Sequence, residues 1–186
     1  MPQDQAPRSA VVAPGRFYSI DGPLLMYARL AVERRGGHTH PIVWDLPDTV
    51  GFGEEHGQVA SQVVSAIDAV ITATGVTPLV IAKSTGTLAA SVVADRGLAA
   101  VWLTPLLTDE PTVAAMRRAT GPCLLAGGTG DGFWDGRTAR SITPHVVEVE
   151  GADHGMFIPG RLAASAMALA TVITAVEDFL DHIAWA

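Results

Sequence analysis

A serine at a predicted strand-to-helix junction is the residue of this chain best placed to do chemistry. Ser84 lies at the centre of residues 82–86 (Ala-Lys-Ser-Thr-Gly), after the apolar run 78–81 and before the helix-like run 87–94. Small residues at both ends of this pentapeptide permit a sharp turn and close packing of the helix against the strand. The usual pattern is G-x-S-x-G, and alanine is the least costly replacement for its first glycine. The spacing predicts a serine nucleophile exposed at the end of a strand.

An acid and a histidine follow this serine in the order that one type of catalytic triad requires. Asp131 and His154 each follow a predicted strand and a short loop. Serine is a poor nucleophile at neutral pH and needs a base, which His154 would supply, while Asp131 would hold the imidazole in the correct tautomer. Asp135 competes with Asp131 for the role of the acid. Asp153 is adjacent to the histidine in sequence, and we expect its side chain to point elsewhere.

Together these motifs resemble the α/β-hydrolase fold superfamily, and more narrowly its small single-domain members. The resemblance runs from about residue 10 to the C-terminal helix and rests on the segments 11–16, 83–84, 128–131 and 151–155. It implies an acyl-enzyme mechanism with an oxyanion hole made of two backbone N–H groups. One would belong to Thr85 and the other to Arg16, which follows Gly15. The family often has His-Gly where this chain has Pro-Gly, but a backbone donor does not depend on that side chain.

The elements that must position these residues can be predicted from hydrophobic runs. Solid apolar runs alternate with helix-like segments, which predicts an α/β fold with a mostly parallel, twisted sheet and helices on both of its faces. Strands are predicted at 10–13, 41–44, 79–82, 98–103, 123–126 and 146–149, and helices at 21–34, 54–72, 87–94, 111–119 and from about 160. Residues 104–121 hold only a loop and one short helix. We therefore expect no lid domain and a shallow, open site.

Length and composition limit the class of protein. The 186 residues suit one domain, 1–186, with residues 1–9 as a loose tail. A formal net charge of −7 argues against a nucleic-acid partner, and the single cysteine, Cys123, excludes an intramolecular disulfide. The start of the chain lacks a secretory pattern, and the apolar run 162–176 is predicted to be a core helix rather than a membrane span. We expect a cytoplasmic protein with no membrane partner, and a homo-oligomer stays open.

Other chemistry-bearing residues have simpler interpretations. Lys83 could draw in an acidic substrate or polarise the site, but we expect its stem to pack under the turn and its charge to pair with an acid. His38, His40 and His56 could suggest a metal site, yet their surroundings favour a surface location. The glycine-rich loop 127–130 lacks the Lys-Ser/Thr of a phosphate-binding loop. We therefore predict neither a cofactor nor a metal.

The resemblance and the triad order predict a serine hydrolase that cleaves a small-molecule ester through an acyl-enzyme. Two alternatives remain open. One is a non-catalytic protein that binds a small ligand or a partner on the same fold. The other is an acyltransferase, which differs only in what attacks the acyl-enzyme.

Overall fold

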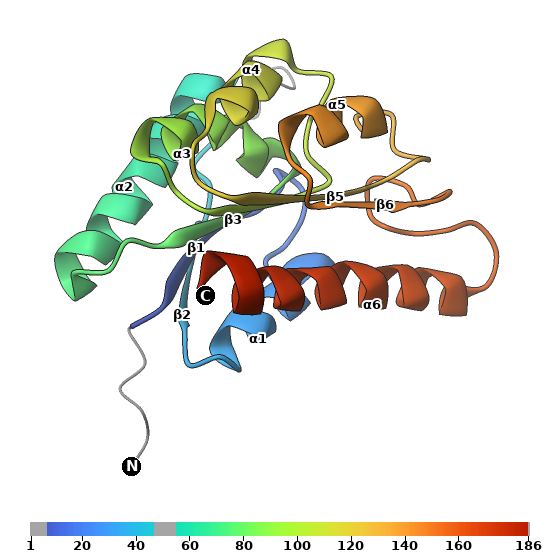
Figure 1. Cartoon of the computed structure of the whole chain (residues 1–186), viewed down its shortest axis with the longest axis horizontal. Coiled ribbons are helices and arrows are strands. Elements are labelled where there is room, and N and C mark those ends of the chain that lie inside the picture. Colours follow the sequence, from blue (N-terminus) through green and yellow to red (C-terminus); the bar gives the residue numbers. More distant parts are fainter. Residues whose placement is uncertain (1–6, 47–54, 186) are drawn as a thin grey trace.

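The computed structural model describes residues 7–46 and 55–185, and these form one six-stranded sheet between two layers of helices (Figure 1). The strand order is β2-β1-β3-β4-β5-β6, and every neighbouring pair is parallel. The strands are β1 (Ser9–Ala13), β2 (His38–Pro41), β3 (Leu79–Lys83), β4 (Ala100–Leu103), β5 (Cys123–Gly128) and β6 (Val146–Val149). The four central strands are buried along their whole length, which confirms the parallel sheet expected from the solid apolar runs.

Helices cover both faces of this sheet. In Figure 1, α2, α3, α4 and α5 lie above it, and α1 and α6 lie below it. The helices are α1 (Pro23–Glu33), α2 (His56–Thr74), α3 (Ala90–Arg96), α4 (Glu110–Arg118), α5 (Gly136–Ile142) and α6 (Leu162–Phe179). A 3₁₀ segment, η1 (Ser84–Ala89), precedes α3, and a short π-helical segment, η2 (Leu180–Ala184), follows α6.

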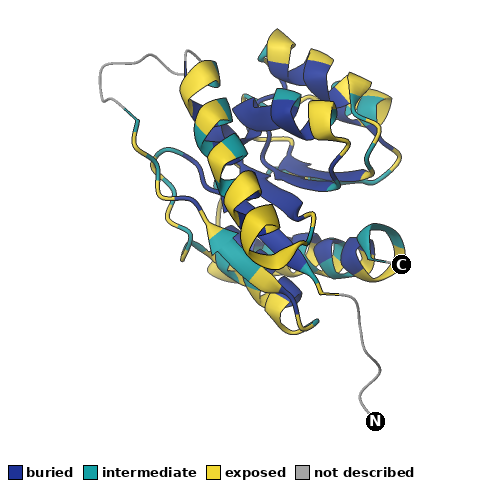
Figure 2. Ribbon diagram, turned by 90° about the vertical axis from the view of Figure 1, so that its left-hand side faces the viewer, coloured by how far each residue is buried: buried dark blue, intermediate teal, exposed yellow. Residues whose placement is uncertain are grey.

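The two faces carry separate hydrophobic clusters, because successive strand residues point to opposite sides. On β3, Val80 and Ala82 join the cluster under α2–α5, whereas Leu79 and Ile81 join the cluster under α1 and α6. Figure 2 shows the same separation on the helices, whose inner faces are buried and whose outer faces are exposed. Because Lys83 is two residues beyond Ile81, its side chain belongs to the α1–α6 side.

The edge strand β2 lies earlier than the sequence predicted. We expected a strand at 41–44, but the structure places it at His38–Pro41. β2 pairs only with β1 and is partly exposed, so it does not need apolar residues. Ile42 continues the pairing with one bond from its N–H to Val12 O (2.8 Å) and then packs into the core.

A short helix and several boundaries also differ from prediction. α5 was not expected, because its seven residues bury only Ala139 and show no apolar period. β1 starts at Ser9, inside the predicted loose tail 1–9, of which residues 1–6 lie outside the described residues. Position 54, the predicted start of the second helix, also lies outside them, and α2 ends at Thr74 before a left-handed Gly75.

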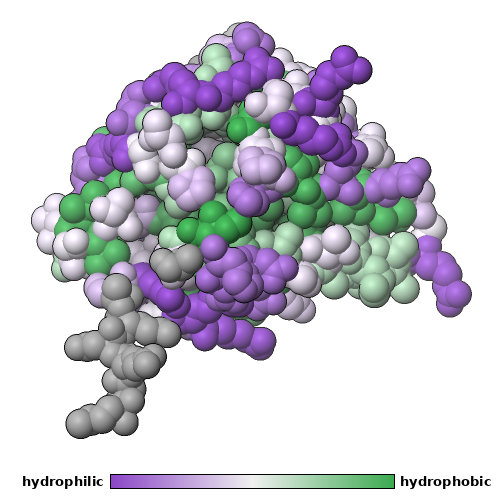
Figure 3. Space-filling view, in the orientation of Figure 1, coloured by the Kyte–Doolittle hydropathy of each residue, from purple (hydrophilic) through white to green (hydrophobic). Residues whose placement is uncertain are grey.

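The terminal helix α6 is apolar enough to resemble a membrane span. Among the described residues, only the 23-residue segment Leu162–Ala184 has the length and composition of a membrane-crossing helix. In the structure one of its faces packs against the sheet beside α1, and its buried residues are Ser165, Ala168, Val172, Val176 and Phe179. Its outer face keeps exposed apolar side chains such as Leu162 and Met167, and hydrophobic surface extends over this region in Figure 3.

The connection between β4 and β5 is short. It holds α4 and two loops, with no further helix or strand within it. No lid therefore covers the carboxyl ends of the central strands from this connection, as the sequence predicted.

Candidate active site

Ser84 stands at a strained turn directly after β3. Its φ is +50°, in the left-handed region that residues with a side chain rarely adopt. The turn is locked by Thr87, whose hydroxyl donates to Ser84 O (2.6 Å) and accepts from the N–H of Leu106 (3.3 Å). The strain is held in place by its surroundings and lifts the Ser84 side chain out of the strand.

Two glycines allow the backbone to pass close to this turn. A Cβ at Gly86 would lie 2.3 Å from Ala13 O, which would force β1 and η1 apart. A Cβ at Gly15 would lie 3.3 Å from the Cβ of Ser84, in the loop that follows β1. Gly86, one of the two small residues singled out in the sequence, therefore serves the close approach of η1 to β1.

Ser84, His154 and Asp131 form one continuous chain of hydrogen bonds. His154 Nε2 lies 2.8 Å from Ser84 Oγ, and His154 Nδ1 lies 2.7 Å from Asp131 Oδ2. The carboxylate can only accept, so Nδ1 of the neutral imidazole donates to Asp131 and Nε2 is left to accept the serine proton. The Asp131 side chain is fully buried, and its other oxygen accepts from the N–H of Phe133 (2.9 Å). The Phe133 ring also packs edge-on against the imidazole, with centroids 5.2 Å apart.

The two rival acids lie elsewhere. Asp135 caps α5, where it accepts from the N–H of Arg137 (3.0 Å) and the hydroxyl of Thr138 (2.7 Å). These bonds lower the pKa of its exposed carboxyl. Asp153 accepts from the backbone of its own turn, from Gly155 (2.8 Å) and Phe157 (2.9 Å). Of these three acids, only Asp131 is hydrogen-bonded to the imidazole of His154.

A pocket of about 210 Å³ opens above Ser84. Its lining comes from the loop after β1, the turn after β3 and the loops after β5 and β6, and consists of Gly15, Arg16, Phe17, Tyr18, Lys83, Ser84, Thr85, Phe133, His154 and Gly155. Arg16 forms an ion pair with the fully buried Glu55, which precedes α2. The ring of Phe17 is 90% exposed, so this side of the pocket is open to solvent.

Both residues predicted for the oxyanion hole, Arg16 and Thr85, line this pocket beside Ser84. Thr85 is buried in the first turn of η1, and Arg16 directly follows the close-packed Gly15. The structure therefore brings all five predicted site residues together. Their catalytic roles stay predictions.

Lys83 differs from expectation. Its side chain is buried, as expected, but its ammonium donates to the backbone carbonyl of His154 (3.1 Å) rather than to an acid. Its Nζ also lies 4.4 Å from the ring centroid of Tyr18. Burial lowers the pKa of Lys83 to about 8, against the raising effect of the Asp131 and Asp153 charges. Sequence reasoning could not find these contacts, because they join the strand to a loop 71 residues away.

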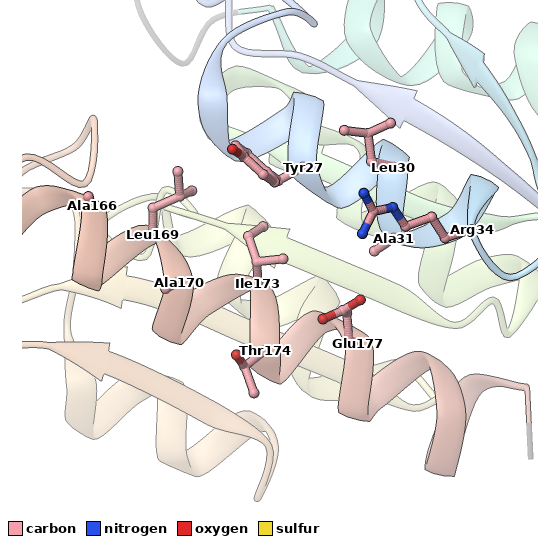
Figure 4. Close-up of a pocket in the computed structure, with 10 residues that line it drawn as sticks. All are labelled: Tyr27, Leu30, Ala31, Arg34, Ala166, Leu169, Ala170, Ile173, Thr174 and Glu177. Atoms are coloured by element: carbon pink, nitrogen blue, oxygen red, sulfur yellow. The ribbon is translucent and has the colours of Figure 1, made fainter.

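The remaining candidates show no comparable arrangement. Among the described residues, no group of three or more His, Cys, Asp or Glu side chains could hold a metal ion. A larger groove, of about 390 Å³, runs between α1 and α6 (Figure 4). Its side chains are mainly apolar, with Arg34 and Glu177 toward one end, and it contains no residue of the triad. The smaller pocket is therefore the candidate active site.

Comparison with known proteins supports the fold. No family model matches the sequence, and no curated protein matches it. Solved structures do: a dienelactone hydrolase from Anabaena variabilis has a TM-score of 0.74 at 20% identity, with 97% of this chain and 88% of that chain covered. An alpha-beta serine hydrolase homologue from Coxiella burnetii has a TM-score of 0.71 at 12% identity, covering 91% and 85% of the two chains. A serine hydrolase without a lid from Xanthomonas campestris has a TM-score of 0.69 at 13% identity, covering 96% and 86%.

Proposed function

We propose that this chain, which has the α/β-hydrolase fold, is a serine hydrolase that cleaves a small carboxylic ester. One observation carries the proposal: the unbroken hydrogen-bond chain from Ser84 Oγ through His154 to the buried Asp131, with the serine held at a strained φ. A serine that only capped a helix would need neither the strain nor an imidazole aligned on its hydroxyl.

The mechanism follows from the proton transfers that the hydrogen bonds between Ser84, His154 and Asp131 permit. His154 Nε2 takes the proton of Ser84 as Oγ attacks the ester carbonyl carbon, and Asp131 stabilises the imidazolium that forms. The oxyanion of the tetrahedral intermediate is placed against the backbone N–H groups of Arg16 and Thr85. His154 then gives its proton to the leaving alkoxide, and the alcohol departs. Water attacks the acyl-enzyme in the same way, which releases the acid and restores the serine.

The pocket supports a small substrate. Its volume of about 210 Å³ lies below the ~300–1,000 Å³ typical of pockets that enclose drug-sized ligands. The half-buried rings of Tyr18 and Phe133 lie beside the serine, and the Phe17 side is open to solvent. We further propose that the protein works in the cytoplasm, and the packing of α6 on the sheet supports a soluble form.

A fluorophosphonate tests the central claim, because it reacts much faster with an activated serine than with an ordinary hydroxyl group. Intact-mass analysis of the wild type should show one adduct, and peptide mapping should place it on Ser84. Ser84→Ala should remove the adduct and lower the kcat for p-nitrophenyl acetate on the order of 10⁴-fold or more. Circular dichroism should show an unchanged fold, because Ser84 contributes little to the core. A Ser84→Ala variant that keeps most of its esterase activity would contradict the assignment.

The same assay distinguishes the alternatives. Adding an acceptor alcohol should leave the yield of free acid nearly unchanged if water is the natural nucleophile, whereas an acyltransferase would divert most of the product to the new ester. A wild type that neither labels nor turns over any ester would favour a binding protein on a hydrolase fold.

A further inference from the structure

We propose that Lys83 is a positioning residue that clamps the His154 loop through its ammonium and makes the alignment of the base depend on the lysine's charge. This inference rests on the proposed serine hydrolase function. Its direct support is geometric: the ammonium of the residue before the nucleophile donates to the backbone carbonyl of the base itself, at 3.1 Å.

The strand pleat explains how Lys83 reaches this place. Side chains alternate along β3, so Lys83 lies on the same face as Ile81, on the α1–α6 side. The loop after β6 lies on that face too, since Ala152 and Met156 pack into the same cluster. The lysine stem therefore runs beneath the turn, and its tip meets the loop between these two buried residues.

The contacts of the ammonium differ from those of a surface lysine. The side chain is 2% exposed, and Nζ lies 4.4 Å from the centroid of the Tyr18 ring, which is a favourable cation–π distance. The Tyr18 hydroxyl accepts from the N–H of Leu24 at the start of α1 (3.1 Å), so this ring is itself anchored. The charge is thus held between an anchored aromatic face and the His154 carbonyl.

The loop that carries His154 is also held by bonds of its neighbours, since Ala152 O accepts from the N–H of Gly130 (3.0 Å) and the N–H of Asp153 donates to Phe157 O (2.9 Å). Its own turn is closed by Asp153, and Met156 adopts a positive φ of 64°. Both features shape the loop, but the Lys83 bond ties the His154 backbone to the strand that carries the nucleophile. Because a shift of about 1 Å in a reacting group can cost ~100-fold in rate, loosening this tie should slow the attack of Ser84.

The pKa of Lys83 lies within the pH range over which labelling rates can be measured. Burial lowers its pKa to about 8, and the carboxylates of Asp131 and Asp153 oppose this shift. Burial raises the pKa of the facing Tyr18 above its ordinary value of 10. Arg16 lines the same pocket and is paired with Glu55. As pH rises through about 8, the ammonium becomes an amine, which loses the cation–π attraction and is a weaker donor to the carbonyl. The clamp is therefore complete well below pH 8, is lost in about half of the molecules near pH 8 and weakens further above it.

The test measures the second-order rate constant for fluorophosphonate labelling of Ser84 from pH 6 to 10. The wild-type rate should fall as pH rises through about 8 and should approach the rate of Lys83→Met. Lys83→Met, which keeps the stem and removes the charge, should label about 10- to 100-fold more slowly at pH 7 and should show no fall above pH 8. With an ester, its kcat should drop while KM changes less than about threefold.

Two further variants separate charge from packing. Lys83→Arg keeps a cation throughout this range, so its profile should also lack the fall above pH 8, with a rate at pH 7 above that of Lys83→Met. Tyr18→Phe keeps the ring face but loses the hydroxyl that anchors it to Leu24, so its diagnostic readout is the shape of the profile, and the fall through about pH 8 should remain. The fall cannot then be attributed to the tyrosine hydroxyl.

The failures are distinguishable. A wild type that is not labelled at any pH overturns the proposed function and this inference together. A wild type that labels on Ser84 with a flat profile from pH 8 to 10 overturns only the role of Lys83, as does a Lys83→Met variant that labels like the wild type. If Lys83→Met does not fold, the wild-type profile decides the question without it.

Discussion

At the scale of single residues, the candidate site depends on the carboxylate that is hydrogen-bonded to the imidazole of His154. Asp131 is fully buried and divides its two oxygens between His154 Nδ1 and the N–H of Phe133. The carboxylate is thereby fixed by a backbone donor of its own loop. An asparagine in its place would present either an oxygen or an NH₂ to Nδ1, and the wrong choice would favour the unproductive tautomer of the imidazole.

Asp131→Asn should therefore lower kcat for a p-nitrophenyl ester by about 10³- to 10⁴-fold. Asp135→Asn is the matched control, four residues away, and should change kcat less than about twofold, because asparagine also caps helices well and α5 lies outside the pocket. Steady-state kinetics of both variants, with thermal melting to confirm the fold, make the comparison. The reverse ranking would move the acid to Asp135.

Sequence reasoning reached the residues of this site by their order and by the elements before them. Ser84, Asp131 and His154 each follow a strand, and parallel strands bring their carboxyl ends to one edge, so proximity could be predicted without coordinates. Asp131 was preferred to Asp135 because it follows its strand after one short loop, but both lie in the same turn-rich segment, and the contact with His154 is seen only in the structure. The partner of Lys83 was equally out of reach, because its contact depends on how a distant loop folds back.

At the scale of elements, the turn between β3 and η1 is the critical junction. Gly86 lies against Ala13 O of β1, and no side chain fits between them. The helical segment after the serine must approach β1 this closely if the serine is to sit between the loops after β1 and β6. Larger residues at this position would move η1, and with it the nucleophile.

Gly86→Ala should lower the free energy of unfolding by about 1–3 kcal/mol through this overpacking, and it should also reduce fluorophosphonate labelling of Ser84. Gly57→Ala provides the opposite case, because a Cβ there meets nothing within 4 Å and the residue lies in the first turn of α2. It should raise the free energy of unfolding by roughly 0.5 kcal/mol and leave labelling unchanged. Urea denaturation of both variants measures the two effects, and equal stability of the pair would refute the packing argument.

The prediction of strands and helices was correct where an element had to bury a face, and it was wrong where the element did not. The central strands can be recognised in the sequence as unbroken apolar runs, because helices cover both faces of the sheet there. The edge strand β2 is half exposed and rich in histidine. The sequence-based prediction therefore placed this strand too late, on the apolar residues that follow it. α5 was missed because it buries one alanine only.

At the scale of the whole molecule, the short connection between β4 and β5 determines how much of a substrate can be enclosed. Only α4 and its loops lie there, and the pocket above Ser84 is bounded by side chains of four loops. The groove between α1 and α6 shares no lining residue with this pocket, but a second apolar pocket, of about 180 Å³, shares Gly155 with the site pocket and Leu169 with the groove. We expect a long acyl chain to pass the exposed rim at Phe17 into solvent.

Ester preference should reflect this limit. Each methylene that the pocket buries adds about 0.8 kcal/mol, or about fourfold in kcat/KM, so the specificity constant should rise over the first few carbons of the acyl chain. Once the pocket of about 210 Å³ is filled, further methylenes remain in water and add nothing. The kcat/KM values for p-nitrophenyl acetate, butyrate, octanoate and palmitate, measured below the micelle concentration of each ester, should rise over the short chains and then level off, with no further gain for palmitate. A steady rise to palmitate would contradict this limit and would point to the apolar pocket beyond Gly155 or to a second copy of the chain as the binding wall. Repeating the series at several protein concentrations would distinguish the two.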